Sequence, residues 1–325
     1  MRQAGSGCYN RDPKGVVSGE NMIVIIGATG RTGGAAARDL LEKGEKLRLV
    51  GRDEKKLERL VQNGSEAAVG NIEDVAFLRK VFDGASAVYL VVPEDISQQD
   101  LRAHQERVTD SFAAAISSAR VPYVVALSSI GAQHAEKTGP IVGLHNLEQK
   151  LNRISGLNAL YLRAGYFMEN LLLNLAPLHS AGMLPGGLRA DFRMPWIASK
   201  DIGKYAAKRL FARDFFGKSV QELHGQRDLS MQEAASIVGK AIDRPEVKYQ
   251  QVPVAILEGS FRQMGMPTNT VALLMEMWSA ANAGLIAPQE ARSPENTTST
   301  NLESFVAEVF APAYRNFAVR QATDL

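Results

Sequence analysis

Three glycines follow an apolar run at a spacing that lets a phosphate group reach the backbone. The run 22–26 is apolar and rich in β-branched residues, and Gly27-Ala-Thr-Gly-Arg-Thr-Gly33 comes directly after it. This pattern predicts a buried parallel strand, a sharp turn, and a helix that begins near Arg31 or Thr32. Gly30 leaves amide N–H groups bare at the positive end of the helix dipole, which favours phosphate binding. The sequence therefore predicts a pyrophosphate cradle for a nucleotide cofactor, formed by Gly27, Thr29, Gly30, Arg31, Thr32 and Gly33.

The residue after the next strand indicates which cofactor the cradle prefers. The predicted strand 47–50 ends at Gly51-Arg52, where a site for NAD(H) usually carries an acid that binds the ribose 2′-hydroxyl. A guanidinium instead suits a 2′-phosphate, so NADP(H) is favoured over NAD(H), with Lys56 and Arg31 adding positive charge. The neighbouring Asp53 argues against this assignment. The alternative is that Arg52 only faces water at the start of a charged helix.

Further apolar runs alternate with helical patterns, as in a doubly wound parallel sheet. Such a sheet binds ligands outside the carboxyl ends of its strands. Asn71, Val92, Pro93 and Ser128 follow predicted strands and are expected to contact the cofactor, although each fits an ordinary strand-to-helix loop equally well. The predicted strands are 67–69, 87–92, 123–127 and 158–162, and the predicted helices between them are 75–82 and 98–119.

Four further segments, taken together with the glycine motif, indicate a protein family. They are Leu127-Ser-Ser-Ile-Gly131, His145-Asn-Leu-Glu-Gln-Lys-Leu151, Leu162-Arg-Ala-Gly-Tyr-Phe-Met-Glu-Asn-Leu171 and Ser199-Lys-Asp-Ile-Gly203. Together they resemble the NmrA-like branch of the atypical short-chain dehydrogenases/reductases, over roughly residues 22–314. The glycine motif is shared by the whole superfamily, whereas the LR-x-x-x-F-M-E-N stretch is the specific part.

This resemblance implies a fold and two classes of function. The implied fold is α/β, with an N-terminal Rossmann domain at residues 21–163 and a smaller α+β lobe at 164–325 that closes a substrate cleft. Residues 199–213 are expected to pack back on the Rossmann domain. One implied function is an NAD(P)H-dependent reductase of quinone-like, azo or other conjugated aromatic acceptors. The other is a non-catalytic NADP(H)-sensing redox regulator that acts through a protein partner.

The chain departs from the superfamily in its catalytic residues. Typical members use a Tyr-x-x-x-Lys pair for proton transfer, yet no tyrosine here has a lysine four residues later. The matching places fall on Pro140 and Leu144. An ordinary alcohol dehydrogenase is therefore not expected. Electron-poor acceptors that take their proton from water remain compatible with the chain.

The catalytic and substrate-binding candidates lie in the segments that follow the predicted strands 123–127 and 158–162. His145 and Ser128 are the candidates for proton transfer, with His134 equally ambiguous. A locally hydrogen-bonded helix residue is the alternative for His145. Aromatic and thioether side chains suit a flat substrate, but the same side chains often plug the joint between two lobes. The residues expected to line the acceptor pocket are Tyr166, Phe167, Met168 and Asn170.

The composition predicts an enzyme-sized globular protein. Its 325 residues are 45% hydrophobic and 22% charged, with a net charge of +2, so neither a nucleic-acid footprint nor a membrane partner is expected. The single cysteine excludes an internal disulfide, and no metal site is expected. The leader 1–20 lacks an apolar signal core, which predicts a flexible start and a cytoplasmic protein, monomeric or homodimeric.

Two patterns in the C-terminal half predict helices. Ser230 and Glu233 have the spacing of a capping box before a helix at 231–241. Residues 302–310 read as a last amphipathic helix.

Overall fold

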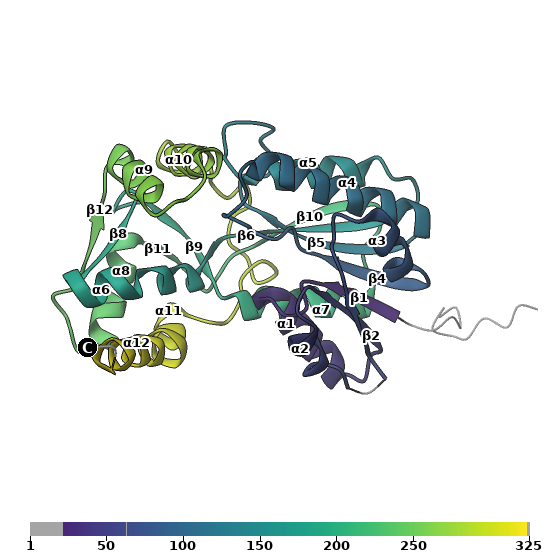
Figure 1. The fold of residues 1–325 in the computed structure, drawn as a ribbon, viewed down its shortest axis with the longest axis horizontal. Helices are drawn as coiled ribbons and strands as arrows, with labels where there is room; N and C mark the ends of the chain where they lie inside the picture. The colour runs from purple at the N-terminus through teal and green to yellow at the C-terminus, as the bar shows by residue number, and fades with distance from the viewer. Residues whose placement is uncertain (1–21, 63, 324–325) are drawn as a thin grey trace, which may run out of the picture.

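The computed structural model describes residues 22–62 and 64–323, and within them a parallel sheet of seven strands carries the fold. The strand order is β10-β6-β5-β4-β1-β2-β3, and helices cover both faces. This is a doubly wound α/β fold, which confirms the predicted fold class (Figure 1). Its strands are β1 (Met22–Ile26), β2 (Leu47–Gly51), β3 (Glu66–Val69), β4 (Ala85–Leu90), β5 (Tyr123–Ser129), β6 (Asn158–Ala164) and β10 (Lys218–Leu223).

Two cores fill the space between the sheet and its helices. One lies under α1, α2 and α7, and the other lies under α3, α4 and α5 on the opposite face (Figure 1). The central strands are continuously apolar because both of their faces are covered. The bounds of these helices are α1 (Arg31–Glu42), α2 (Glu54–Glu58), α3 (Val75–Phe82), α4 (Leu101–Ala119), α5 (Ile141–Asn152) and α7 (Ser199–Ala212).

Two elements from beyond residue 163 belong to this part of the molecule. Helix α7 packs on α1, as expected for residues 199–213. Strand β10 pairs with β6 in parallel from Lys218 to Leu223 and forms one edge of the sheet, which the sequence had not indicated. The segment is mostly polar because an edge strand is only partly covered.

The remaining elements form the C-terminal lobe at the left of Figure 1. Its core surrounds Trp196 and Met168, and the segment 288–301 returns from this lobe to the end of β10. The elements are β7 (Tyr166–Phe167), η1 (Met168–Asn174), α6 (Leu175–Ala181), β8 (Met183–Gly186), β9 (Arg193–Ile197), β11 (Asp228–Ser230), α8 (Met231–Ala241), β12 (Lys248–Gln251), α9 (Val254–Gln263), α10 (Thr268–Asn282), α11 (Leu302–Phe305), η2 (Val306–Phe310) and α12 (Ala311–Thr323).

Two details of this lobe bear on the sequence predictions. The capping box of α8 is present, with Glu233 N donating to Ser230 Oγ and Ser230 N donating to Glu233 Oε2. The predicted last helix at 302–310 was too short, because the chain passes through a π-helical turn at η2 and continues as α12.

No helix among the described residues is both long and apolar enough to cross a bilayer. The same residues contain no cluster of His, Cys, Asp and Glu that could hold a metal ion.

Candidate functional site

The amino end of α1 is open where a phosphate group would bind. Gly30 is its N-cap residue, no side chain caps the helix, and its first turn contains no acidic residue. Gly27 has a φ of +69°, a conformation that favours glycine, and its carbonyl oxygen accepts a 2.8 Å hydrogen bond from Gly30 N. The first N–H groups of a helix have no partner within the helix, so this end favours an anion.

Glycines hold the helix close to the turn and to its neighbour. A Cβ atom at Gly33 would lie 2.3 Å from Gly27 O, and one at Gly203 of α7 would lie 2.4 Å from Thr32 O. Neither position can carry a side chain without moving backbone. Thr32 is itself buried, whereas Thr29, Gly30 and Arg31 are exposed. The residues present therefore fit a group that carries a diphosphate.

The side chain of Arg52 is exposed where it could meet a 2′-phosphate. Its side chain is 80% exposed, and the acid within ion-pair range is Asp95, whose Oδ2 lies 4.0 Å from Arg52 Nη1. Asp53 is directed elsewhere, because its carboxylate accepts a hydrogen bond from Lys56 N at 3.1 Å as the cap of α2. This hydrogen bond is the main reason that the pKa of Asp53 is lowered. Lys56 Nζ also lies 3.1 Å from Asp53 Oδ2, so this lysine is paired with the acid that argued against NADP(H).

The loops after β3 and β4 flank the same end of the sheet. Asn71 is exposed, and its Oδ1 accepts a 3.0 Å hydrogen bond from Glu73 N, which shapes the turn into α3. Val92 and Pro93 are half-buried after β4. Sequence reasoning missed the two acids that follow, Glu94 and Asp95, since a charge after a strand resembles an ordinary exposed loop.

Ser128 belongs to a buried charged network. Its hydroxyl donates to Glu148 Oε1 at 2.6 Å, and Arg163 donates to both oxygens of the same carboxylate, from Nε at 3.0 Å and from Nη2 at 2.7 Å. The Glu148 side chain is 3% exposed and that of Arg163 is 10% exposed. The network joins β5, α5 and β6, so the Ser128 hydroxyl supports the sheet. No sequence pattern paired these three residues.

Both histidine candidates are half-buried and hydrogen-bonded to backbone. His145 Nδ1 lies 2.8 Å from Ala132 O, so it is the nitrogen that carries the donated proton, and Nε2 is left for other contacts. His134 Nε2 lies 3.1 Å from Leu285 O and thus ties the loop after β5 to the C-terminal lobe.

The residues expected to line an acceptor pocket are partly taken up by packing contacts within the protein. Tyr166 packs edge-on against Trp196, with ring centroids 4.8 Å apart. Burial raises the pKa of Tyr166 to about 12, and a hydrogen bond from Asn170 counteracts part of this shift. Met168 is buried in the lobe core, and Phe167 packs against the core beneath α1 and α7.

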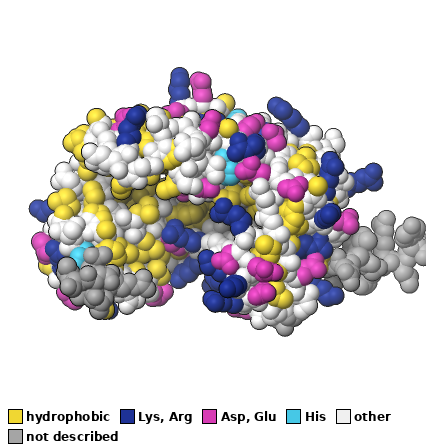
Figure 2. Space-filling view, viewed as in Figure 1, with side chains coloured by type: hydrophobic (Ala, Val, Ile, Leu, Met, Phe, Trp, Pro, Cys, Tyr) yellow, Lys and Arg dark blue, Asp and Glu magenta, His cyan; other side chains and the backbone are white. Residues whose placement is uncertain are grey.

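Figure 2 shows a hollow between the two parts of the molecule. Hydrophobic side chains line its interior, and Lys and Arg side chains gather on its lower rim, on the side of α1 and α2. An apolar cleft with a basic rim suits a flat acceptor beside a phosphate-bearing cofactor.

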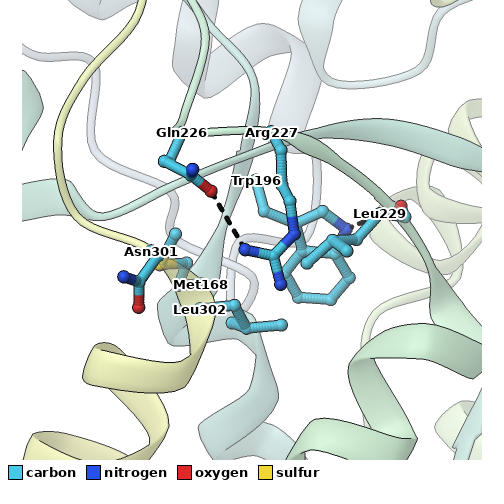
Figure 3. Close-up of a pocket in the computed structure, with 7 residues that line it drawn as sticks. All are labelled: Met168, Trp196, Gln226, Arg227, Leu229, Asn301 and Leu302. Carbon is cyan, nitrogen blue, oxygen red and sulfur yellow. Dashed lines mark hydrogen bonds between the residues drawn. The ribbon is translucent and has the colours of Figure 1, made fainter.

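Figure 3 shows a second, narrow pocket in the C-terminal lobe. Arg227 extends across it, and its Nη1 donates to Gln226 Oε1 at 3.0 Å. Side chains largely fill this pocket, so it is a packing feature rather than a candidate for the active site. Its lining residues are Met168, Trp196, Gln226, Arg227, Leu229, Asn301 and Leu302.

Comparisons with known proteins find relatives and solved structures that resemble this chain over most of its length. The NAD(P)H azoreductase of Xenophilus azovorans is 25% identical over 268 residues, which cover 82% of this chain and 89% of that protein. The NADPH-dependent quinone oxidoreductase QOR2 of Escherichia coli, solved in complex with NADPH, has a similar fold. Its TM-score is 0.74 at 21% identity, over 89% of this chain and 100% of that one. The negative transcriptional regulator NmrA, solved in complex with NADP, has a TM-score of 0.63 at 17% identity, over 92% of this chain and 98% of that one.

A family model matches the chain over most of its length. It is that of the NmrA-like family, and it spans residues 19–309, a range that includes β1 and nearly all of η2. The match includes the glycine turn, the loops at the carboxyl edge of the sheet and most of the C-terminal lobe. This protein therefore belongs to the NmrA-like family.

Proposed function

We propose that this protein is an NADPH-dependent reductase of quinone-like, azo or other conjugated aromatic acceptors. The observation that carries the proposal is the uncapped amino end of α1, enclosed by glycines and bordered by the exposed side chains of Arg31 and Arg52. This arrangement provides bare N–H groups for a diphosphate and a guanidinium for a 2′-phosphate. The cofactors of the azoreductase and of the quinone oxidoreductase support the same assignment.

Each part of the cleft has a role in this proposal. When bound, NADPH supplies a hydride to an acceptor held against its nicotinamide ring. The first turn of α1 binds the diphosphate, and Arg52 binds the 2′-phosphate. Asn71 borders the adenosine half, and the segment Val92-Pro93 borders the nicotinamide half.

The acceptor occupies the hollow between the two parts of the molecule. In this proposal Tyr166, held edge-on by Trp196, forms a rigid aromatic wall of the hollow that a planar acceptor stacks against. Because its pKa is about 12, the Tyr166 hydroxyl stays protonated at neutral pH. Orientation of the acceptor supplies most of the rate, and the proton comes from water or from His145.

A cofactor-sensing regulator is the second candidate. The missing Tyr-x-x-x-Lys pair and the similarity in fold to NmrA support it. A sensor binds NADP(H) tightly, turns over no acceptor, and changes its affinity for a protein partner when the cofactor is bound.

Two measurements separate these functions. Calorimetric titration with NADPH, NADP, NADH and NAD tests the cofactor, and loss of NADPH absorbance with a panel of quinones and azo dyes tests turnover. The reductase predicts steady oxidation of NADPH by at least one acceptor class. Tight binding of NADPH without oxidation by any member of the panel would favour the sensor.

Arg52→Ala is the variant that tests the cofactor assignment. The reductase and the sensor both predict a loss of NADPH affinity of about tenfold or more, since a charge-assisted pair with phosphate is removed. NADH affinity should change less than about twofold. Equal losses for both cofactors would contradict the role of Arg52.

A further inference from the structure

An ion pair crosses the mouth of the cofactor cradle. Arg52 follows β2 and Asp95 follows β4, and in the sheet these two strands lie on either side of β1. Since neighbouring strands are about 4.8 Å apart, β2 and β4 are separated by about 10 Å. The Arg52 side chain spans this gap, and its Nη1 comes within 4.0 Å of Asp95 Oδ2. The pair therefore passes over the glycine turn that follows β1.

The acid in this pair is held by hydrogen bonds, whereas the arginine is largely exposed. Asp95 Oδ1 accepts from Ser97 Oγ at 2.6 Å and from Ser97 N at 3.2 Å, and Oδ2 accepts from Gln98 Nε2 at 2.9 Å. These hydrogen bonds, with Ser97 first, lower the pKa of Asp95 to about 2, so the carboxylate is charged at neutral pH. Its side chain is 21% exposed, against 80% for Arg52.

A second acid, Glu94, precedes Asp95 in the same loop after β4. Burial raises the pKa of Glu94, and the positive charge of Arg31 counteracts this shift. Both arginines expected to meet cofactor phosphates thus have an acid of the loop after β4 in their electrostatic range.

We propose that Asp95 is a specificity-determining residue for the cofactor: its carboxylate competes with the 2′-phosphate for Arg52 and so narrows the preference for NADPH over NADH. The inference rests on the proposed function, because it assumes that Arg52 meets the 2′-phosphate. A 2′-phosphate carries about −1.5 to −2 charges at neutral pH. To bind Arg52, this phosphate must draw the guanidinium away from the Asp95 carboxylate, and the carboxylate also repels the phosphate. NADH has no such group and leaves the Arg52–Asp95 pair intact.

Asp95→Asn is the test, measured by calorimetric titration of NADPH and NADH. The amide oxygen of the variant can still accept from Ser97, and the Gln98 amide can rotate so that its oxygen accepts from the new amide nitrogen, so the loop hydrogen bonds are retained while the charge is removed. NADPH affinity should rise about three- to tenfold, the range expected for an exposed ion pair and a nearby like charge. NADH affinity should change less than about twofold. The gain for NADPH should shrink in about 0.5 M KCl because salt screens exposed charges.

A matched control variant and a second genetic background test whether the gain in NADPH affinity depends on the Arg52–Asp95 pair. Asp243→Asn removes the same charge from a residue of the C-terminal lobe whose φ of +58° asparagine tolerates, and it should alter neither affinity. In an Arg52→Ala background, Asp95→Asn should give a smaller gain, because the competition for the guanidinium is gone.

Fragments of the cofactor test the contribution of the 2′-phosphate alone. The ratio of affinities for 2′,5′-ADP and 5′-AMP should rise in Asp95→Asn as it does for NADPH and NADH. An unchanged NADPH affinity, an equal change for both cofactors, or a loss confined to NADH would overturn the role of Asp95 while leaving the proposed function in place. Failure of the wild-type protein to bind NADPH would overturn both.

Discussion

Glu148→Ala should cost the protein much of its stability. The substitution removes the carboxylate that accepts hydrogen bonds from Ser128 and from two nitrogens of Arg163. The Arg163 guanidinium, with a side chain only 10% exposed, then loses the carboxylate that pairs with it. Breaking such a buried pair costs about 3–5 kcal/mol, against about 5–15 kcal/mol for the total stability of a typical domain.

Two further variants show whether the cost comes from the unpaired charge. Glu148→Leu combined with Arg163→Met removes both charges of the pair, so it should recover most of the loss. Ser128→Ala removes one hydrogen bond to a carboxylate that keeps its arginine, which predicts a smaller loss of about 1.5–3 kcal/mol.

Urea unfolding followed by far-UV circular dichroism measures these changes. Both tryptophans, Trp196 and Trp278, lie in the C-terminal lobe, so their fluorescence follows that lobe and shows whether the two parts unfold together. A loss below about 1 kcal/mol for Glu148→Ala would refute the reasoning about the unpaired charge. Abolished turnover in Ser128→Ala at unchanged stability would instead show a catalytic Ser128.

Three other predictions concern the cleft. Gly30→Ala adds a methyl group 3.1 Å from Gly27 O, at a position with ordinary backbone angles. Calorimetry should show NADPH binding weakened about tenfold or more, because the methyl group lies where the phosphate approaches the backbone. Urea unfolding should show a change in stability within about 1 kcal/mol. Unchanged NADPH affinity would mean that no phosphate lies against this turn. Because the pKa of Asp95 is lowered to about 2, its contribution to stability is present above its unfolded value, near 4, and is lost as pH falls toward 2. Between about pH 4 and 2 the wild-type protein should therefore lose more stability than Asp95→Asn, and parallel curves would show that the hydrogen bonds of Asp95 stabilise nothing. Tyr166→Leu removes the aromatic wall held by Trp196, so steady-state kinetics should show a higher KM for aromatic acceptors while the Kd for NADPH stays within about twofold; an unaltered KM would place the acceptor elsewhere.

Features that depend on neighbouring residues could be read from the sequence. Helix α1 begins at Arg31, as predicted, and α3 covers the predicted residues 75–82. The capping box at Ser230 and Glu233 is also present. These features are set by backbone sterics and by hydrogen bonds between residues a few positions apart, so a short stretch of sequence contains their cause. The fold class and the NmrA-like family are also confirmed, since the glycine turn and its flanking elements predict the fold and the LR-x-x-x-F-M-E-N stretch carries the family signal.

The tertiary structure decided which distant residues meet. Strand β10 joins β6 across more than fifty residues, and its polar sequence could equally form a loop. The pairing of Ser128 with Glu148 and Arg163 depends on three elements packing at once. Asp95 approaches Arg52 only because β2 and β4 flank β1 in the sheet. Each of these contacts depends on strand order and layer packing, which are properties of the whole chain rather than of any local segment.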